Sequence, residues 1–160
     1  RGRRPRGAQR RSAPAAGPGA DPRVVAVMGL GSSKAPPPRD PVASAKLLAA
    51  VRRCDPTATA AQLEKNGDPD IRSEHSGMTA LMFAAKCPEN SGQLVRQLLA
   101  ARADVHATSN SRQTALHEAV AWEHKAAVRL LLDAGASKDA KDAHGHTPRN
   151  LAFRRNGMHL

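Results

Sequence analysis

Seven histidines and two cysteines are the side chains of this sequence best suited to bind a metal ion or to act in catalysis. His144 and His146 flank a single glycine, and the other histidines are scattered along the chain. A zinc site gathers about four Cys, His or carboxylate ligands, often at short spacings, and no such spacing occurs here. We therefore predict no metal site and no cofactor, and we interpret each histidine as structural.

The two cysteines, Cys54 and Cys87, form no Cys-x-x-Cys pair, and two cysteines do not make a disulfide framework. We predict inert thiols and a reducing, cytoplasmic compartment. The place of Cys87 before Pro88 would allow this thiol to be exposed. No apolar run approaches the roughly 18 residues of a membrane span.

Motifs for catalysis are missing from the sequence. It contains no nucleophile elbow, phosphate-binding loop or metalloprotease signature. Gly29-Leu30-Gly31 lacks the third glycine and the strand–helix context of a dinucleotide fingerprint. Aromatic residues make up 2% of the chain, so a core must be built from Leu, Val, Ala and Met. Such a core suits a stack of small helices better than an enzyme with a deep pocket, and we predict that the chain is not an enzyme.

The elements that would position these residues recur along the chain. A short extended piece is predicted at 103–107, followed by a polar turn at 109–111, a helix start at 114–119 and a second helix at 126–132. The helix-start pattern also occurs at 79–84 and 147–152, and its threonines are 35 and then 33 residues apart. A turn and two short helices in about 33 residues resemble the ankyrin-repeat family.

The resemblance implies an all-α solenoid of about three and a half repeats with β-hairpin-like turns, running from Asp40 to Leu160. We predict a degenerate N-terminal cap at 40–67 and repeats at 68–102, 103–135 and 136–160. The last repeat stops where its second helix should begin. Either further repeats follow or the stack ends half covered, and we favour a truncated repeat.

Local signals predict the helix ends. Asp40 and Asp55 each precede a proline, which is typical of a helix start. Asn66 and Gly67 predict a helix end, with Gly67 in the left-handed position.

The turn that precedes each repeated helix differs among the repeats. Gly77 and Gly145 stand where the family's turn resembles one that needs a positive φ, whereas the central repeat has Arg112 there. A positive φ is uncommon for a residue other than glycine, so we predict a strained turn at Arg112. The central repeat also has Ser109 where an aspartate is usual, and the last repeat has Arg149 where a leucine is usual.

Residues 1–39 are predicted to be a disordered basic tail, because they are rich in Arg, Pro, Gly, Ala and Ser and carry little apolar surface. Met28-Gly29, with Ser33 four residues after the glycine, fits the pattern for N-myristoylation. If translation starts at Met28, residues 1–27 are leader and Gly29 can be acylated, which is the only membrane association that we predict. An Arg-rich leader also resembles an organelle transit peptide. These alternatives stay open.

The resemblance also implies where a partner would be held: at the hairpin tips and at exposed residues late in each first helix, along the concave side. The matching helix positions are Lys86, Cys87, Ala121, Trp122, Arg154 and Arg155. The matching hairpin positions are Glu74, His75, Met78, Asn110, Arg112, Gln113, Ala143, His144 and His146.

We predict a monomeric, non-enzymatic protein–protein interaction module, an adaptor or scaffold that binds an acidic or mixed protein surface. Trp122 is the only tryptophan, and Trp is enriched among interface hot spots. The competing interpretation is that Trp122 packs over the loop at 87–92. Two other functions remain: nucleic-acid contact through the basic tail, which we consider the weaker reading, and a regulatory segment of a larger enzyme or signalling protein that continues past Leu160.

Overall fold

The computed structural model describes residues 38–156, with the backbone alone for Arg155 and Asn156. Residues 1–37 of the predicted basic tail and the acylation of Gly29 lie outside this range, whereas Arg39, at the end of the predicted tail, forms an ion pair with Asp68. Within it, no helix is both long enough and apolar enough to span a membrane.

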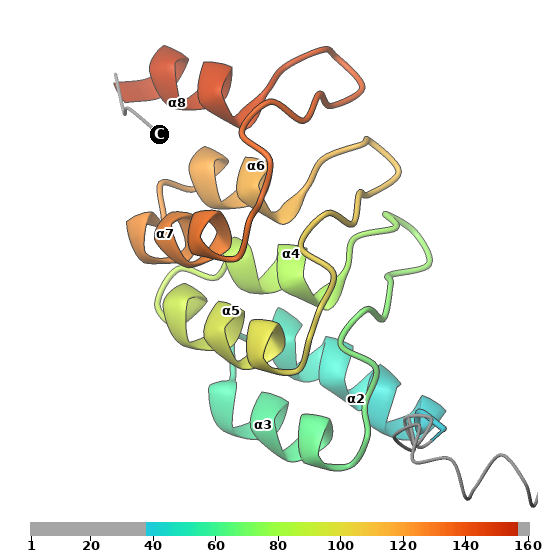
Figure 1. Ribbon diagram of the computed structural model, residues 1–160. Helices are drawn as coiled ribbons and strands as arrows, with labels where there is room; N and C mark the ends of the chain where they lie inside the picture. The colour runs from blue at the N-terminus through green and yellow to red at the C-terminus, as the bar shows by residue number, and fades with distance from the viewer. Residues whose placement is uncertain (1–37, 157–160) are drawn as a thin grey trace, which may run out of the picture. The chain divides into compact units, whose positions relative to one another are not determined.

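The helices form two rows. The first row contains α2, α4, α6 and α8, each packed against the next, and the second row contains α3, α5 and α7 (Figure 1). Each second-row helix also packs against the first-row helix that precedes it in the chain. The bounds of the helices are Pro41–Arg52 (α2), Pro56–Glu64 (α3), Ala80–Ala85 (α4), Ser91–Ala100 (α5), Ala115–Ala121 (α6), Lys125–Asp133 (α7) and Pro148–Asn156 (α8).

The described residues contain no strand, and a single isolated bridge joins Arg72 to Thr79. The predicted all-α class is therefore confirmed. The division into a cap and three repeats at the stated boundaries remains a prediction.

The two predicted aspartate caps are confirmed. The carboxylate of Asp40 accepts the backbone N–H of Val42 at 2.8 Å, and that of Asp55 accepts the N–H of Thr57 at 2.9 Å. A proline occupies the first turn after each cap, where a missing N–H costs nothing. Both helices therefore begin as predicted. α2 buries Leu47 and Val51 in the core, whereas α3 buries only Thr59.

The core lies between the two rows of helices and between successive pairs. Leu116, Ala119, Val128 and Leu131 are buried, as the 33-residue repeat predicts. The same repeat spacing predicts that Leu132 is buried, and this prediction is wrong, because Leu132 is only partly buried against the edge of the core. At the position equivalent to Leu116 in the last repeat, Arg149 is exposed.

Two local predictions are wrong. Asn66, and not Gly67, has the positive φ (61°) at the end of α3. Gly67 is needed for space instead, because a Cβ there would lie 2.8 Å from the carbonyl oxygen of Gln62. The expected extended piece at 103–107 contains a turn, closed by the N–H of Ala107 on the carbonyl oxygen of Asp104 at 3.4 Å.

The turn glycines behave as the sequence predicts. Gly77 and Gly145 have positive φ, and Arg112 has a φ of 58° in the equivalent turn. Ser109 replaces the usual aspartate of this turn by accepting the N–H of Gln113 on its hydroxyl oxygen at 3.3 Å. The conformation of the turn is therefore kept without either of its usual residues.

Candidate functional site

The three loops that precede α4, α6 and α8 are stacked on one side of the helices (Figure 1). The N–H of Asn110 donates to the carbonyl oxygen of Ser76 at 3.1 Å, and the N–H of Ala143 donates to that of Ser111 at 2.9 Å. The guanidinium of Arg72 adds a bond to the carbonyl oxygen of Thr108 at 2.7 Å. These bonds fix each loop against the next, so the tips form one row.

The structure places the predicted hairpin residues along this row. His75, Arg112 and His144 are exposed, whereas Met78, Gln113 and His146 are partly buried. The amide group of Asn110 donates to the carbonyl oxygen of His75 at 3.3 Å, which brings the first two tips together.

The last loop is organised by Asp142. Its carboxylate accepts the N–H groups of His146 at 2.8 Å and His144 at 2.9 Å. Burial would raise the pKa of Asp142, but these two N–H groups and the nearby histidine rings hold it below its ordinary value of 3.8. Arg154 donates to Nε2 of His146 at 3.3 Å, so this predicted binding residue lies beside the third tip. The side chain of Arg155 lies outside the described residues, and its role stays a prediction.

His117 is fully buried and joins two repeats. Its Nδ1 accepts the N–H of Thr114 at 3.1 Å, which leaves Nε2–H as the donor to the carbonyl oxygen of His146 at 3.2 Å. In the preceding repeat Met82 takes the place of His117, and the buried hydroxyl of Thr79 has no hydrogen-bond partner. His117 is thus a structural residue that positions the third loop.

The buried imidazole predicts that the protein loses stability in mild acid. Burial lowers the pKa of His117 from its ordinary value of 6.5, against smaller opposing effects of His146 and Asp142. Because the unfolded chain takes up this proton first, the free energy of unfolding should fall as pH drops below 6.5 towards the lowered pKa. Urea unfolding at about pH 7.5 and about pH 5.5 measures this. His117→Asn, which keeps an acceptor for Thr114, should show a smaller decrease, and an equal decrease would contradict the assignment.

The first row of helices carries alternating cationic and aromatic side chains. The guanidinium of Arg52 lies 5.7 Å from the centre of the Phe83 ring, and the ammonium of Lys86 lies 6.0 Å from the same ring. Lys86 is also 5.6 Å from the ring of Trp122. All three distances are within the range of about 6 Å for cation–π attraction. We refer to Arg52, Phe83, Lys86 and Trp122 as the cation–π ladder.

Trp122 stays largely open to solvent, with 54% of its surface exposed. The carboxylate of Glu118, one helical turn earlier, interacts with the indole N–H. Burial raises the pKa of the Glu118 carboxyl from its ordinary value of 4.5, although Lys86 and the indole oppose the rise. The indole is therefore oriented by Glu118 and Lys86 while its remaining surface is free to make contacts.

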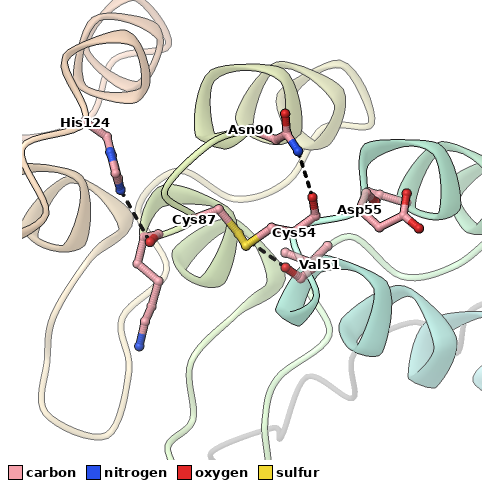
Figure 2. Close-up of a disulfide and its surroundings, with 8 residues drawn as sticks. Val51, Cys54, Asp55, Cys87, Asn90 and His124 are labelled. Carbon is pink, nitrogen blue, oxygen red and sulfur yellow. Dashed lines mark hydrogen bonds between the residues drawn. A yellow bond between two sulfur atoms is a disulfide. The ribbon is translucent and has the colours of Figure 1, made fainter.

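A disulfide lies beneath the ladder. Cys54 and Cys87 are bonded, with their Cα atoms 5.7 Å apart (Figure 2). The prediction of two inert thiols is wrong, as is the exposure expected for Cys87, which is buried. The two cysteines are 33 residues apart, so they occupy the same position in successive repeats. Stacking of α4 on α2 then brings them within disulfide range.

The loop between α4 and α5 is held from both sides of this disulfide (Figure 2). The amide of Asn90 donates to the carbonyl oxygen of Cys54 at 3.0 Å. The ring of His124 donates from Nε2 to the carbonyl oxygen of Lys86 at 3.4 Å. The loop at 87–92 is thus a fixed link among three helix pairs, and the backbone of Lys86 is fixed with it.

The ladder borders a pocket of about 300 Å³. The four ladder residues line it together with Cys54, Cys87 and Pro88, and we call it the ladder pocket. A second hollow of about 270 Å³, between α2 and the first hairpin loop, shares Arg52 and includes His75. The predicted contact residues Lys86 and Trp122, on the helices, and His75, on a hairpin, thus border two neighbouring hollows. Within the described residues, no three His, Cys, Asp or Glu side chains come close enough to hold a metal ion.

Lys86 and Trp122 were predicted contact positions, whereas Arg52 and Phe83, which lie beside them in the ladder, were not predicted. Phe83 is three residues before Lys86, a spacing that places both on one face of a helix, and this signal could have revealed it. Arg52 had no such signal, because its contact with Phe83 depends on how α2 and α4 stack.

Comparisons with known proteins agree with this arrangement. Residues 47–156 match the family described as ankyrin repeats, in three copies. The chain is similar to "SH3 and multiple ankyrin repeat domains protein 1" of Homo sapiens, with 37% identity over 86 residues, 54% of this chain and 4% of that protein. It is also similar to "Ankyrin repeat and SOCS box protein 16" of Mus musculus, with 36% identity over 97 residues, 57% of this chain and 21% of that protein.

The chain therefore spans a small part of the length of these relatives. The match to the family covers more than half of the chain, and the two rows of helices with stacked loops are the arrangement expected of its repeats. The chain belongs to the ankyrin-repeat family, whose repeats generally serve protein–protein interaction.

Proposed function

We propose that this chain is a non-enzymatic adaptor or scaffold that holds a protein partner on the face formed by the first row of helices and the hairpin tips. The observation that carries the proposal is the environment of Trp122. A large aromatic side chain is 54% exposed, yet Lys86 and Glu118 hold it in place beside a pocket. Exposed aromatic residues with fixed orientation are typical of interface hot spots.

The hairpin tips and Arg154 supply the rest of the proposed surface. Lys86, Arg112 and Arg154 are cationic, and they favour an acidic or mixed partner through charge complementarity. These charges lie at the edge of the surface in contact with water, so their contribution should decrease with salt. We propose that Trp122 supplies most of the affinity and the cations supply the preference for acidic partners.

Trp122→Ala tests the proposal. The full chain is immobilised, binders are selected from a displayed peptide library, and the affinity of each purified binder is measured for parent and variant. We expect a loss of about 2 kcal/mol, or roughly 30-fold in Kd, because the indole would be a central contact. The midpoint of urea unfolding should stay nearly unchanged, since half of the side chain is already in water.

Two controls separate recognition from packing. Trp122→Phe keeps an aromatic ring and should retain part of the affinity. Arg129→Ala, on the exposed side of α7, should leave binding unchanged. If the stability of Trp122→Ala falls in step with its affinity, Trp122 acts in packing. If the affinity is intact, the binding surface lies elsewhere, and Arg112 and His144 are the next positions to test.

A further inference from the structure

The ladder pocket combines an apolar interior with charged edges. Its apolar surface comes from Phe83, Pro88, Trp122 and the disulfide, and its volume is about 300 Å³. That volume lies at the lower limit of pockets that bind small molecules, roughly 300 to 1,000 Å³. It is suited to one bulky side chain.

The edges of the pocket are positively charged. Arg52 and Lys86 both line it, and none of the lining residues is an aspartate or a glutamate. Among residues 38–156 the ion pairs join Arg39 to Asp68 and His146 to Asp142, so neither cation of the pocket is neutralised by an ion pair. Glu118 offsets part of the charge of Lys86. Arg52 also lines the neighbouring hollow, which includes Glu74, but Glu74 does not line the ladder pocket.

The pocket is also rigid. The disulfide, Asn90 and His124 fix the loop that carries Lys86 and Pro88. Cation–π contacts hold both aromatic rings under their cations. A site that is already ordered loses little entropy when a partner binds, so even a short segment could be recognised.

We propose that the ladder pocket binds one bulky apolar side chain in an extended segment of a partner protein, and that Arg52 and Lys86 pair with carboxylates within two residues of that side chain. This inference rests on the proposed function and adds the chemistry of the partner. Insertion of the side chain removes the exposed faces of Trp122 and Phe83 from water. The flanking carboxylates pair with Arg52 and Lys86 at the edges of the same pocket.

Charge argues against the chain's own N-terminal segment as the occupant. Residues 1–27 contain seven arginines and one aspartate, and they would bring like charges to Arg52 and Lys86. The segment that fits is acidic, with an aromatic or large aliphatic residue among its carboxylates.

The test uses the full chain and a synthetic peptide of about nine residues in which one Phe is flanked on each side by two Asp or Glu residues. Isothermal titration is run at low and at high salt. Compared with this peptide, the form in which Ala replaces the Phe should have a Kd roughly tenfold higher. The form in which Lys replaces the flanking acids should bind more weakly still. The double variant Arg52→Gln, Lys86→Gln should lose roughly tenfold at low salt and less at high salt.

The matched control is Arg96→Gln with Arg129→Gln, which removes two exposed cations from the second row of helices and should bind as the parent does. The inference is overturned if the acidic Phe peptide binds no more tightly than its Ala or Lys forms, or if the ladder double variant binds like the parent. It is also overturned if that double variant abolishes self-association in sedimentation without peptide, because the occupant is then a second copy. The acidic peptides could show no preferential binding while Trp122→Ala still weakens the selected binders. In that case the proposed function stands, and only the inferred chemistry of the partner is wrong.

Discussion

Replacing Cys54 and Cys87 with serine should lower the free energy of unfolding by about 3 to 4 kcal/mol. The bond closes a loop between residues 33 apart, and the loss follows from the entropy that the unfolded chain regains when this loop opens. The bond also joins the first helix pair to the second, which otherwise pack through α2 on α4 and α3 on α5. A short stack has little reserve against the loss of such a link. Urea unfolding of the oxidised parent and the double variant measures the difference.

Reduction provides an independent control. A dithiol reductant, which is oxidised as the disulfide becomes two thiols, should destabilise the parent by a similar amount and should leave the double variant unaffected. The single variants Cys54→Ser and Cys87→Ser should resemble the double variant, because either one removes the bond. A parent whose unfolding curve is the same with and without reductant would show that the bond contributes nothing to stability.

Leu131→Ala should cost about 2 to 5 kcal/mol, because it leaves a cavity where the side chain is fully buried between α5, α6 and α7. In this stack each helix pair contacts only the neighbouring pairs, so few other contacts can compensate for the lost packing of Leu131. Denaturant unfolding, followed by circular dichroism, gives the change directly.

Leu132→Ala is the matched control. It removes the same atoms one residue further along α7, where the side chain is only partly buried. Its cost should be clearly smaller than that of Leu131→Ala. Equal losses at the two positions would mean that the repeat has been assigned with the wrong register.

Much of the fold could be predicted because its signals are local. Asp40 and Asp55 mark helix starts through bonds to N–H groups two residues later, and Leu116 and Leu131 recur at the repeat spacing. The end of α3 could not be predicted to the residue, because Asn and Gly both tolerate a positive φ. Position 67 requires glycine for another reason, since a Cβ there would clash with the carbonyl oxygen of Gln62. That close approach exists only in the folded chain.

The site was predicted less completely, because it depends on contacts between repeats. The family pattern points to Lys86 and Trp122 but carries no information about which residues face them across the stack. Cys54 and Cys87 show this most clearly. Their 33-residue separation is the length of one repeat, and this places them side by side once the helices stack.

The fluorescence of Trp122 tests the central claim most directly. The chain has one tryptophan and no tyrosine, so its intrinsic emission reports on this residue alone. Titration with a selected binder that lacks tryptophan should shift the emission to shorter wavelength and reduce quenching by iodide, as the exposed indole leaves water. Tight binding with an unchanged emission maximum and unchanged quenching would contradict the claim that partners are held at Trp122.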